Sequence, residues 1–496
     1  MKRITINRSS LVFALSLLAV LCTATSCKKF VTVPTTAAKV DGAEVFQSNA
    51  AAIGLMTGVY ANATRNSEGY FPYLSIGAGL SADELTAYGI GSPVNTALYS
   101  NNLTNTFTYF WSEFYNYIYV TNQILEGIAG PNKLSPDVLT RLSGEAKFTR
   151  ALFYYYLVTL HGDVPLVTAT DYTQNEQKAR TPAAQVYQFI ISDLQDAENL
   201  LGPDYTNADL ETVSTTTRLR PNKWAAAALL ARVYLQTGDY PNAIAEATKV
   251  IGQTNTYHLE TLDNVFLATS QEAILQFQPT SNSSWNTYDA TVFILTTPPS
   301  YSNPVSLSNG LYNAFEDGDN RKTSWVGSLS SGATTYYFPY KYKVRNTGYA
   351  TIPLTEDQMV LRLAEQYLIR AEASIQHGDI AGGIADLNTL RARARAAGTT
   401  AIPDPLPALS STLSKNDALL ALEHERQVEL FTELGDRWLT LKRLKGQSNP
   451  GISRADEIMP AITAAKGGTW STDDQLYPLS LTELNSDSKL TQNPGY

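Results

Sequence analysis

The sequence RPNKWAAAALLARVYLQTGDYPNAIAEATKVIG, residues 220–252, carries the pattern from which the fold of the chain is predicted. Alanines at positions 225–228 leave room for another helix to approach closely. Gly238 and Asp239 interrupt the helical periodicity and predict a turn. Small residues after that turn predict a second helix that packs back on the first. These features are typical of the helical hairpin of a tetratricopeptide-like repeat.

The same pattern recurs, but at irregular spacing. LRLAEQYLIRAEASIQHGDIAGGIADLNTLRARA (361–394) has Gly378-Asp379 at the turn, and GEAKFTRALFYYYLVTLHGD (144–163) ends in the same Gly-Asp pair. Apolar residues at i, i+3 and i+4 predict further helices over 105–128, 186–203 and 415–445. The sequence therefore predicts a mainly α fold. Tetratricopeptide-like hairpins form its scaffold, which is interrupted by irregular loop-rich insertions and a few short strands.

Two segments lack helical periodicity. Residues 70–105 and 255–357 are rich in Ser, Thr, Asn, Gly and Pro, with many aromatic residues. Within the second segment, AILQFQP (273–279) and TVFILTT (291–297) are predicted as short strands. Long irregular segments inside a compact protein are usually functional surfaces, so both are expected to form ligand-binding loops.

The N-terminus has the features of an export signal. Basic residues near the start precede an apolar run at 11–22, which is too short to span a membrane as a helix. Small residues at 24–26 stand directly before Cys27, as in a bacterial lipobox. We therefore expect cleavage before Cys27 and lipidation of its sulfur. The alternative is an ordinary secretory signal followed by an incidental cysteine.

Five parts follow from these patterns. They are a lipoprotein-type signal peptide (1–26), the lipidated cysteine and a tether (27–42), a helical scaffold with an N-terminal ligand-loop region (43–254), an irregular aromatic-rich ligand-binding region (255–357), and C-terminal helical hairpins with a terminal segment (358–496).

Composition excludes several functions. The chain has 2 cysteines, and the first leaves with the signal, so disulfides, cysteine-bound metals and a cysteine nucleophile are not expected. The formal net charge of −9 argues against nucleic acid as a partner, because that needs clustered Lys and Arg. The 29 tyrosines outnumber the 16 phenylalanines. Tyrosine joins an apolar ring to a polar hydroxyl, which suits surfaces that meet sugars.

The search for catalytic chemistry gives little. The four histidines are scattered, and no nucleophile elbow, P-loop, zinc-protease or dinucleotide motif is present. The segment 317–328 begins like a calcium loop but has Ser328 where a bidentate glutamate is required. Adjacent carboxylates occur at 83–84, 356–357 and 473–474, and solvated or capping roles are favoured for them over a glycosidase pair. We expect no catalytic residue, metal or cofactor.

Charged residues gather in HERQVELFTELGDRWLTLKRLK (424–445) and LRARARAAG (390–398). The first could be a buried ion network that locks two helices, or an anion site. Acids and bases at i, i+3 and i+4 mostly pair locally, so a structural role is favoured. The arginines of the second segment are expected at a helix C-terminus, where the helix dipole favours positive charge.

Aromatic residues divide by context. Those in periodic helices are expected in the core, and those in irregular polar segments are candidates for stacking on a sugar ring, although loop aromatics often only hold loops in place. The predicted ligand-binding residues are Trp285, Tyr288, Tyr301, Trp325 and Tyr336, with Asp83 as a polar partner.

Several blocks together resemble the SusD/RagB family of Bacteroidetes outer-membrane lipoproteins. The blocks occur in the family's order, behind a lipobox, and are found at 110–125, 144–167, 220–240, 361–373, 387–394, 425–443 and 490–496. Thr440 and Ser480 depart from the family pattern, in motifs that are structural. The resemblance implies a helical body anchored by lipid to the outer membrane, facing the cell exterior. It also implies a role as nutrient-binding lid on a SusC-like TonB-dependent transporter.

The leading hypothesis is a non-catalytic binding protein for oligosaccharide or polysaccharide fragments. Binding of oligopeptides in the same transporter-lid role is one alternative. A secreted glycan hydrolase would need two carboxylates that converge in a cleft. A helical-repeat scaffold that binds only proteins would show no small ligand. The residues alone do not distinguish one glycan from another.

Overall fold

In the computed structural model, residues 42–65, 71–89, 92–279, 286–345 and 353–496 are described. The chain divides into two units, residues 1–45 and residues 46–496. The first unit contains the short helix α2 (Gly42–Val45), and the second contains all other described elements. The predicted signal and Cys27 lie outside the described residues.

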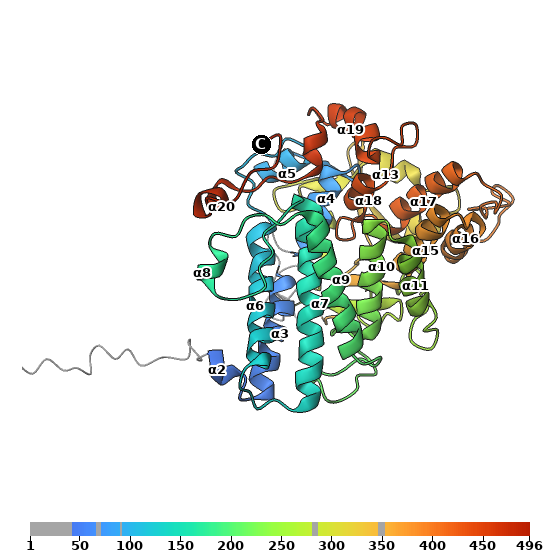
Figure 1. Cartoon of the computed structure of the whole chain (residues 1–496). Helices are drawn as coiled ribbons and strands as arrows, with labels where there is room; N and C mark the ends of the chain where they lie inside the picture. Colours follow the sequence, from blue (N-terminus) through green and yellow to red (C-terminus); the bar gives the residue numbers. More distant parts are fainter. Residues whose placement is uncertain (1–41, 66–70, 90–91, 280–285, 346–352) are drawn as a thin grey trace, which may run out of the picture. The chain divides into compact units, whose positions relative to one another are not determined.

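The second unit is built on a row of helices in which each helix packs against the next (Figure 1). In order along this row the helices are α3 (Asn49–Ala63), α6 (Trp111–Ala129), α7 (Pro136–His161), α9 (Ala183–Leu200), α10 (Lys223–Thr237), α11 (Tyr240–Ile251), α15 (Leu363–His377), α16 (Ile380–Ala394) and α17 (Lys415–Leu430). The helices predicted from periodicity are all present, and the mainly helical fold class is confirmed.

Two helical hairpins of the row, α10–α11 and α15–α16, have the same turn. Gly238 (φ 77°) and Gly378 (φ 107°) end their helices in the left-handed region, which glycine adopts without a steric penalty. The aspartate after each glycine caps the next helix. Asp379 Oδ1 accepts from Gly382 N at 2.9 Å, and Asp239 Oδ1 accepts from Asn242 N at 3.3 Å. The Gly-Asp pair therefore closes one helix and starts the other.

The third Gly-Asp pair behaves differently. Gly162 ends α7 with a positive φ, but no helix begins at Asp163. Instead Asp163 Oδ1 accepts from Ala183 N, at the start of α9, at 2.8 Å. A connection of some twenty residues, with the short helix α8 (Tyr172–Asn175), joins the two helices, which still pack side by side.

Between α11 and α15 the chain leaves the row, and α15 then packs directly on α11. Residues 252–362 therefore form an insertion in the helical scaffold. Its elements are short: β2 (Ala273–Phe277), α12 (Tyr288–Phe293), β3 (Val305–Leu307), α13 (Asn309–Ala314), α14 (Asn320–Trp325), β4 (Val326–Ser331), β5 (Thr334–Pro339) and β6 (Gln358–Arg362). The strands pair antiparallel as β2 with β6 and β4 with β5, while β3 pairs with β1 (Leu85–Ala87).

One of the two predicted strands is wrong. The strand in AILQFQP is confirmed as β2, but most of TVFILTT lies in and after helix α12. The reason is a helix start just before it. Thr287 Oγ1 accepts from Ala290 N at 3.1 Å and so caps the first turn of α12.

Shorter elements cover one end of the helical row, near the top of Figure 1. They include η2 (Phe71–Tyr73), α4 (Leu74–Ser81), α5 (Pro93–Tyr99), α18 (Asp436–Arg443), α19 (Arg454–Ala465), η4 (Thr472–Gln475) and α20 (Leu481–Ser486). Aromatic rings fill the core beneath them: Phe71 packs edge-on against Phe153 and Tyr156, at centroid distances of 5.8 and 5.2 Å. Among the described residues, no helix is both long and apolar enough to cross a membrane.

Candidate ligand-binding face

The two irregular segments predicted from the sequence meet at a small antiparallel pairing. Strand β1 comes from the first segment and β3 from the second, with Ala87 opposite Val305. Tyr88 N then donates to Pro304 O at 2.9 Å. Strand β5 packs beside β3, so side chains from three distant parts of the sequence lie close together.

Tyr88 and Tyr336 meet there, and Tyr301 stands three residues before Pro304 in the chain; we call these three residues the tyrosine face. The rings of Tyr88 and Tyr336 meet edge to face at a centroid distance of 5.8 Å. The Tyr88 hydroxyl lies 3.1 Å from Ser306 Oγ, within hydrogen-bond distance. Tyr301 projects from the turn that leads to Pro304 and is 77% exposed. Tyr88 and Tyr336 are half-buried, so their rings are held in place, while the exposed Tyr301 side chain is free to adapt to a ligand.

A second tyrosine cluster lies on the other side of β5. Successive residues of a strand point to opposite faces, so Tyr337 points away from Tyr336. Its ring stacks on that of Tyr312 with centroids 3.5 Å apart and an interplanar angle of 13°. Lys322 Nζ lies 4.3 Å from the centroid of the Tyr312 ring. Because each ring already covers a face of the other, this pair has less free ring surface than the tyrosine face.

Two other predicted residues, Trp285 and Tyr288, precede Tyr301 in the sequence. Tyr288 is the first residue of α12 and is half-buried. The side chain of Asn303 joins α12 to the turn that carries Tyr301, donating to Thr291 O at 2.8 Å and to Val292 O at 2.7 Å. Trp285 lies outside the described residues, so its prediction is untested.

Trp325 is not a surface residue, which corrects the prediction for it. The side chain is completely buried, and its indole N–H donates to Leu262 O at 2.8 Å. The ring packs against Phe266 and Phe431. The polar residues around Trp325 in the sequence suggested exposure, but α14 turns this side chain inward. A ring with no exposed surface offers nothing for a sugar to stack on.

Asp83 is engaged by an arginine of α18. Its carboxylate accepts from Arg437 Nε at 2.8 Å and from Arg437 Nη2 at 2.7 Å. Burial raises the pKa of Asp83, and the charge of Arg437 outweighs it, so the pKa of Asp83 lies below its usual value. Both carboxylate oxygens therefore bind Arg437 and hold the start of β1 against α18. Asp83 thus helps to position β1 and does not offer a free carboxylate to a ligand.

Most charged residues of 424–445 form buried ion pairs, as the structural interpretation predicts. The pairs join distant elements, however, instead of neighbours on one helix. Glu425 and Glu429 bind Arg321 of the insertion at 2.6 and 2.9 Å, and Arg437 binds Asp83. The arginines at the end of α16 also reach across, since Arg393 binds Glu429 at 2.5 Å. These pairs fasten the insertion to the helical row.

The sequence missed Tyr88, Tyr312 and Lys322 as members of these clusters. Tyr88 lies in the first irregular segment, which was predicted as ligand-binding without a named residue. Its neighbour Tyr336 is some 250 positions away, so only the pairing of β1 with β3 brings the two rings together. No local signal could have indicated that contact.

Comparison with known proteins identifies the family. Residues 84–235 match a sequence profile described as starch-binding, associating with the outer membrane, and residues 308–496 match the profile of the SusD family. The SusD-like protein P2 of Formosa agariphila is 27% identical over 432 residues, which covers 78% of this chain and 80% of that protein. The starch-binding protein SusD of Bacteroides thetaiotaomicron is 23% identical, covering 72% and 73%.

Solved structures agree on the fold. A laminarin-binding SusD-like protein superposes with a TM-score of 0.71 at 24% identity, over 90% of this chain and 99% of that one. A SusD superfamily protein from Bacteroides vulgatus gives a TM-score of 0.71 at 21% identity, over 91% and 100%. The fold is thus that of the SusD superfamily structures. The chain belongs to the SusD/RagB family.

Proposed function

We propose that this chain is a non-catalytic surface binding protein that captures oligosaccharide or polysaccharide fragments and delivers them to a SusC-like TonB-dependent transporter. The observation that carries the proposal is the tyrosine face, assembled from two irregular segments that share no sequence continuity. Tyrosine rings can stack on the C–H faces of a sugar while their hydroxyls bind its hydroxyl groups. The relatives named for binding starch and laminarin support a glycan as the ligand.

The remaining parts of the proposal concern location and partner. Cys27 would carry the lipid that holds the chain to the outer membrane, with residues 28–42 as tether. Lipidation with more than one acyl chain gives durable attachment. The rigid helical row would present a fixed surface to the transporter, and the tyrosine face would hold the ligand until it is handed over.

A binding role without turnover fits the state of the carboxylates. Asp83 is held by Arg437, and Glu356 accepts from the backbone N–H groups of Lys343 and Val344 at 2.7 and 3.1 Å. Asp474 caps η4 by accepting from Ser471 N at 2.7 Å. One carboxylate of each adjacent acid pair therefore has a structural role. A glycoside hydrolase needs a pair that is free to face the scissile bond.

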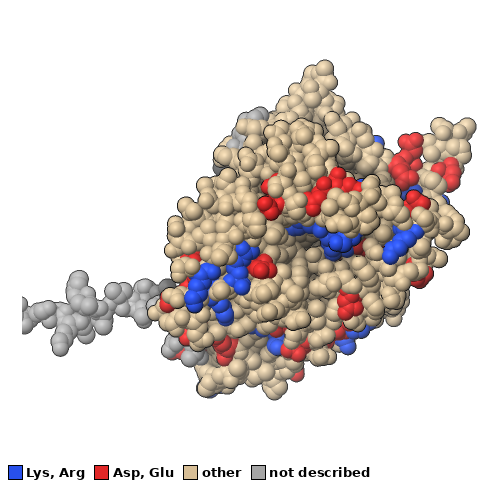
Figure 2. Space-filling model, turned by 45° about the horizontal axis from the view of Figure 1, so that its top comes forward, with Lys and Arg blue, Asp and Glu red and all other residues tan. Residues whose placement is uncertain are grey.

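Uncharged side chains make up most of the face drawn in Figure 2, with basic side chains in a hollow near its middle and acidic ones at the rim. Such a surface suits a neutral polymer better than nucleic acid, which needs a continuous basic patch.

The first experiment uses the soluble form, residues 28–496, in affinity electrophoresis and calorimetry. The panel contains starch, laminarin, xylan, pectin and a peptide mixture. Tyr301→Ala and Tyr336→Ala should each weaken glycan binding by about two- to tenfold, the value of one aromatic contact. Tyr172→Ala is the matched control, because Tyr172 is 73% exposed but lies on α8.

Glycan binding that falls in the two face variants and stays unchanged in Tyr172→Ala would support both the function and the site. Binding unaffected by either face variant would place the ligand elsewhere on the molecule. Binding of peptides alone would favour the oligopeptide alternative. Release of shortened products from any glycan would contradict the non-catalytic role.

A further inference from the structure

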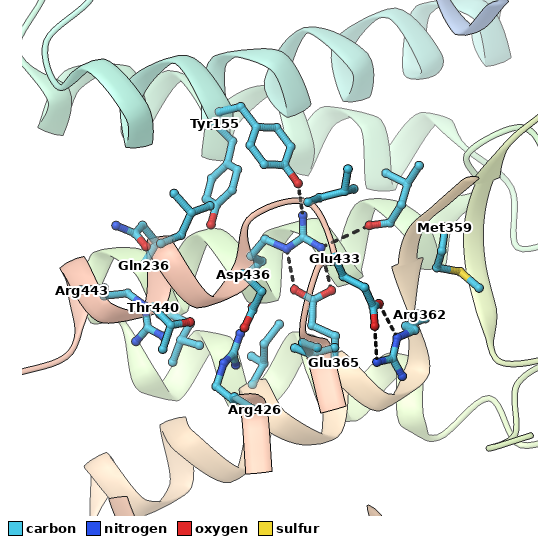
Figure 3. A pocket seen from close by; sticks show the side chains of 18 residues that line it. Tyr155, Gln236, Met359, Arg362, Glu365, Arg426, Glu433, Asp436, Thr440 and Arg443 are labelled. Carbon is cyan, nitrogen blue, oxygen red and sulfur yellow. Dashed lines mark hydrogen bonds and ion pairs between the residues drawn. The ribbon is translucent and has the colours of Figure 1, made fainter. Parts of the chain in front are cut away.

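A polar cavity lies among the helices of the row, on residues that the tyrosine face does not use. Its walls come from α7, α10, α15, α17 and α18 and from the segment before α15 (Figure 3). The space open to the centre of a water-sized molecule between the walls is about 50 Å³. Four arginines and three carboxylates line it: Arg232, Arg362, Arg426 and Arg443, with Glu365, Glu433 and Asp436.

Three of these arginines are saturated by carboxylates. Arg232 binds both oxygens of Glu365 at 2.6 Å, and Arg362 binds both oxygens of Glu433 at 2.7 and 2.9 Å. Arg443 likewise binds both oxygens of Glu372, which stands behind the cavity wall. These bidentate pairs leave little capacity for a further ligand.

Arg426 is the exception. It is 5% exposed, and only its Nη2 makes a hydrogen bond, to Asp436 Oδ1. Its Nε and Nη1 atoms are buried and make no hydrogen bond with any part of the chain that the structure describes. The nearest carboxylate to Nη1 is Glu372 Oε2 at 3.8 Å, beyond hydrogen-bond distance. A buried arginine with unmet N–H donors is costly unless something in the cavity accepts from them.

Two hydroxyl groups line the same cavity. Tyr155 and Thr440 are both buried, and neither hydroxyl makes a hydrogen bond with the described residues. In Figure 3 Tyr155 and Thr440 lie on the same side of the cavity as Arg426 and Asp436. The unmet groups therefore comprise several N–H donors and two hydroxyls that can donate or accept. Their natural partner is a small ligand rich in acceptor oxygens.

The charge balance limits what that ligand can be. The lining side chains carry one more positive than negative charge, and the nearby Glu372 cancels this excess. Because these charges then sum to zero, a dianion such as phosphate would find no excess of positive charge to compensate its two negative charges. A planar carboxylate with a single charge matches the planar guanidinium edge and two flanking hydroxyls.

We propose that this cavity binds a small monocarboxylate, with Arg426 as its principal partner and the hydroxyls of Tyr155 and Thr440 as secondary ones. The site is independent of the tyrosine face, with which it shares no residue. Its occupation would tie α17 and α18 to α7.

The test is isothermal titration calorimetry and thermal unfolding of residues 28–496, which contain the whole compact unit 46–496. Sodium acetate and sodium glucuronate are the probes, at constant ionic strength set with sodium chloride. Glucose is the neutral counterpart of glucuronate. We expect saturable binding of acetate or glucuronate, with a rise in the unfolding temperature, and none for glucose.

Two variants assign the site. Arg426→Gln should weaken carboxylate binding by about ten- to a hundredfold, and Tyr155→Phe by about two- to tenfold, according to whether a charged or a neutral hydrogen bond is lost. Tyr155→Phe removes no charge and keeps the ring, so it preserves the test if Arg426→Gln folds poorly. Arg370→Gln is the control, because Arg370 pairs with Asp386 away from the cavity.

The proposal is overturned if neither probe binds saturably, if glucose binds as well as glucuronate, or if binding persists unchanged in both Arg426→Gln and Tyr155→Phe. Loss of binding in Arg370→Gln as well would indicate a general effect of arginine removal and would also contradict it.

Discussion

Glu84 stands one residue from the ion pair of Asp83 and is a buried acid of a different kind. It is 1% exposed and makes no ion pair with the described residues. One carboxyl oxygen accepts from Thr432 N at 3.3 Å, and the other has no partner there. Burial and the neighbouring charge of Asp83 raise the pKa of Glu84 to about 8. Two adjacent acids thus have opposite protonation states near neutral pH, because only one faces an arginine.

The raised pKa of Glu84 predicts a loss of stability with rising pH. In the unfolded chain its pKa is near 4.5, so between pH 4.5 and 8 the unfolded state releases a proton that the folded state keeps. The free energy of unfolding should therefore fall as pH rises through this window, by up to about 1.4 kcal/mol per pH unit. Glu84→Gln should reduce that slope, measured by urea unfolding at pH 5, 6, 7 and 8.

Glu176→Gln is the control for this prediction, because Glu176 is exposed on the connection between α7 and α9. For Glu176→Gln, the slope of the free energy of unfolding against pH should equal that of the wild type. A second buried acid, Asp289, with a pKa raised by burial to about 7, leaves part of the slope in every variant. If Glu84→Gln has the same slope as the wild type, the carboxyl group of Glu84 is ionised in the folded protein.

At the scale of elements, the Gly-Asp turn shows why the hairpins could be predicted. The turn needs a left-handed residue followed by a helix cap, and glycine and aspartate are the residues suited to those two positions. The insertion lacks such constraints. Strand and helix were equally compatible with the apolar run in TVFILTT, and the cap at Thr287, outside that run, selected the helix.

Substitutions at three glycines can measure the effect of backbone conformation separately from the effect of space for a side chain. A Cβ added at Gly54, Gly238 or Gly378 would have no heavy atom within 4 Å, but only Gly238 and Gly378 have a positive φ. Gly378→Ala and Gly238→Ala should each lower the free energy of unfolding by about 1–2 kcal/mol, because alanine is strained in the left-handed region. Gly54→Ala, inside α3, should raise it by up to about 1 kcal/mol. Urea unfolding of the three variants measures the two expected decreases and the one expected increase in the free energy of unfolding.

Equal effects at all three glycines would contradict this account, because the three sites differ in φ and not in available space. A decrease in the free energy of unfolding for Gly54→Ala alone would show that the alanine methyl group disturbs a contact on the outer face of α3.

At the scale of the whole molecule, the prediction from sequence reached the scaffold but only part of the site. Periodicity and the Gly-Asp turns define the helices locally, so they can be predicted one segment at a time. The contact between Tyr88 and Tyr336 depends on which strands pair. The burial of Trp325 depends on which side of α14 faces the core. Neither can be predicted from the neighbouring residues in the sequence. Tyr301 and Tyr336 were named as ligand-binding candidates because they lie in polar irregular segments, and they remain predictions; the same criterion failed for the buried Trp325.

A set of buried ion pairs joins the insertion to the scaffold. Arg321 takes part in three of these pairs. The side chains of Arg321, Asp319, Glu425 and Glu429 are all 0% exposed. Arg321 lies on α14, beside Lys322 of the stacked tyrosine cluster, while both glutamates lie on α17. Well-paired buried charges add little compared with an apolar core, but loss of one partner leaves the others uncompensated.

Arg321→Met should therefore lower the free energy of unfolding by about 3–5 kcal/mol, because buried Asp319 loses the arginine that pairs with it, while Glu425 and Glu429 keep Arg391 and Arg393. Lys249→Met is the control, because Lys249 is 43% exposed and pairs with Glu198 and Glu246 at the surface, where such pairs contribute about 1 kcal/mol or less. If the insertion is fastened to the scaffold at this point, Arg321→Met should also expose Trp325, whose indole fluorescence would shift to the red before the helices unfold. A single transition with wild-type fluorescence and an unchanged midpoint would instead mean that β2–β6 pairing and ring packing hold the insertion without the charges.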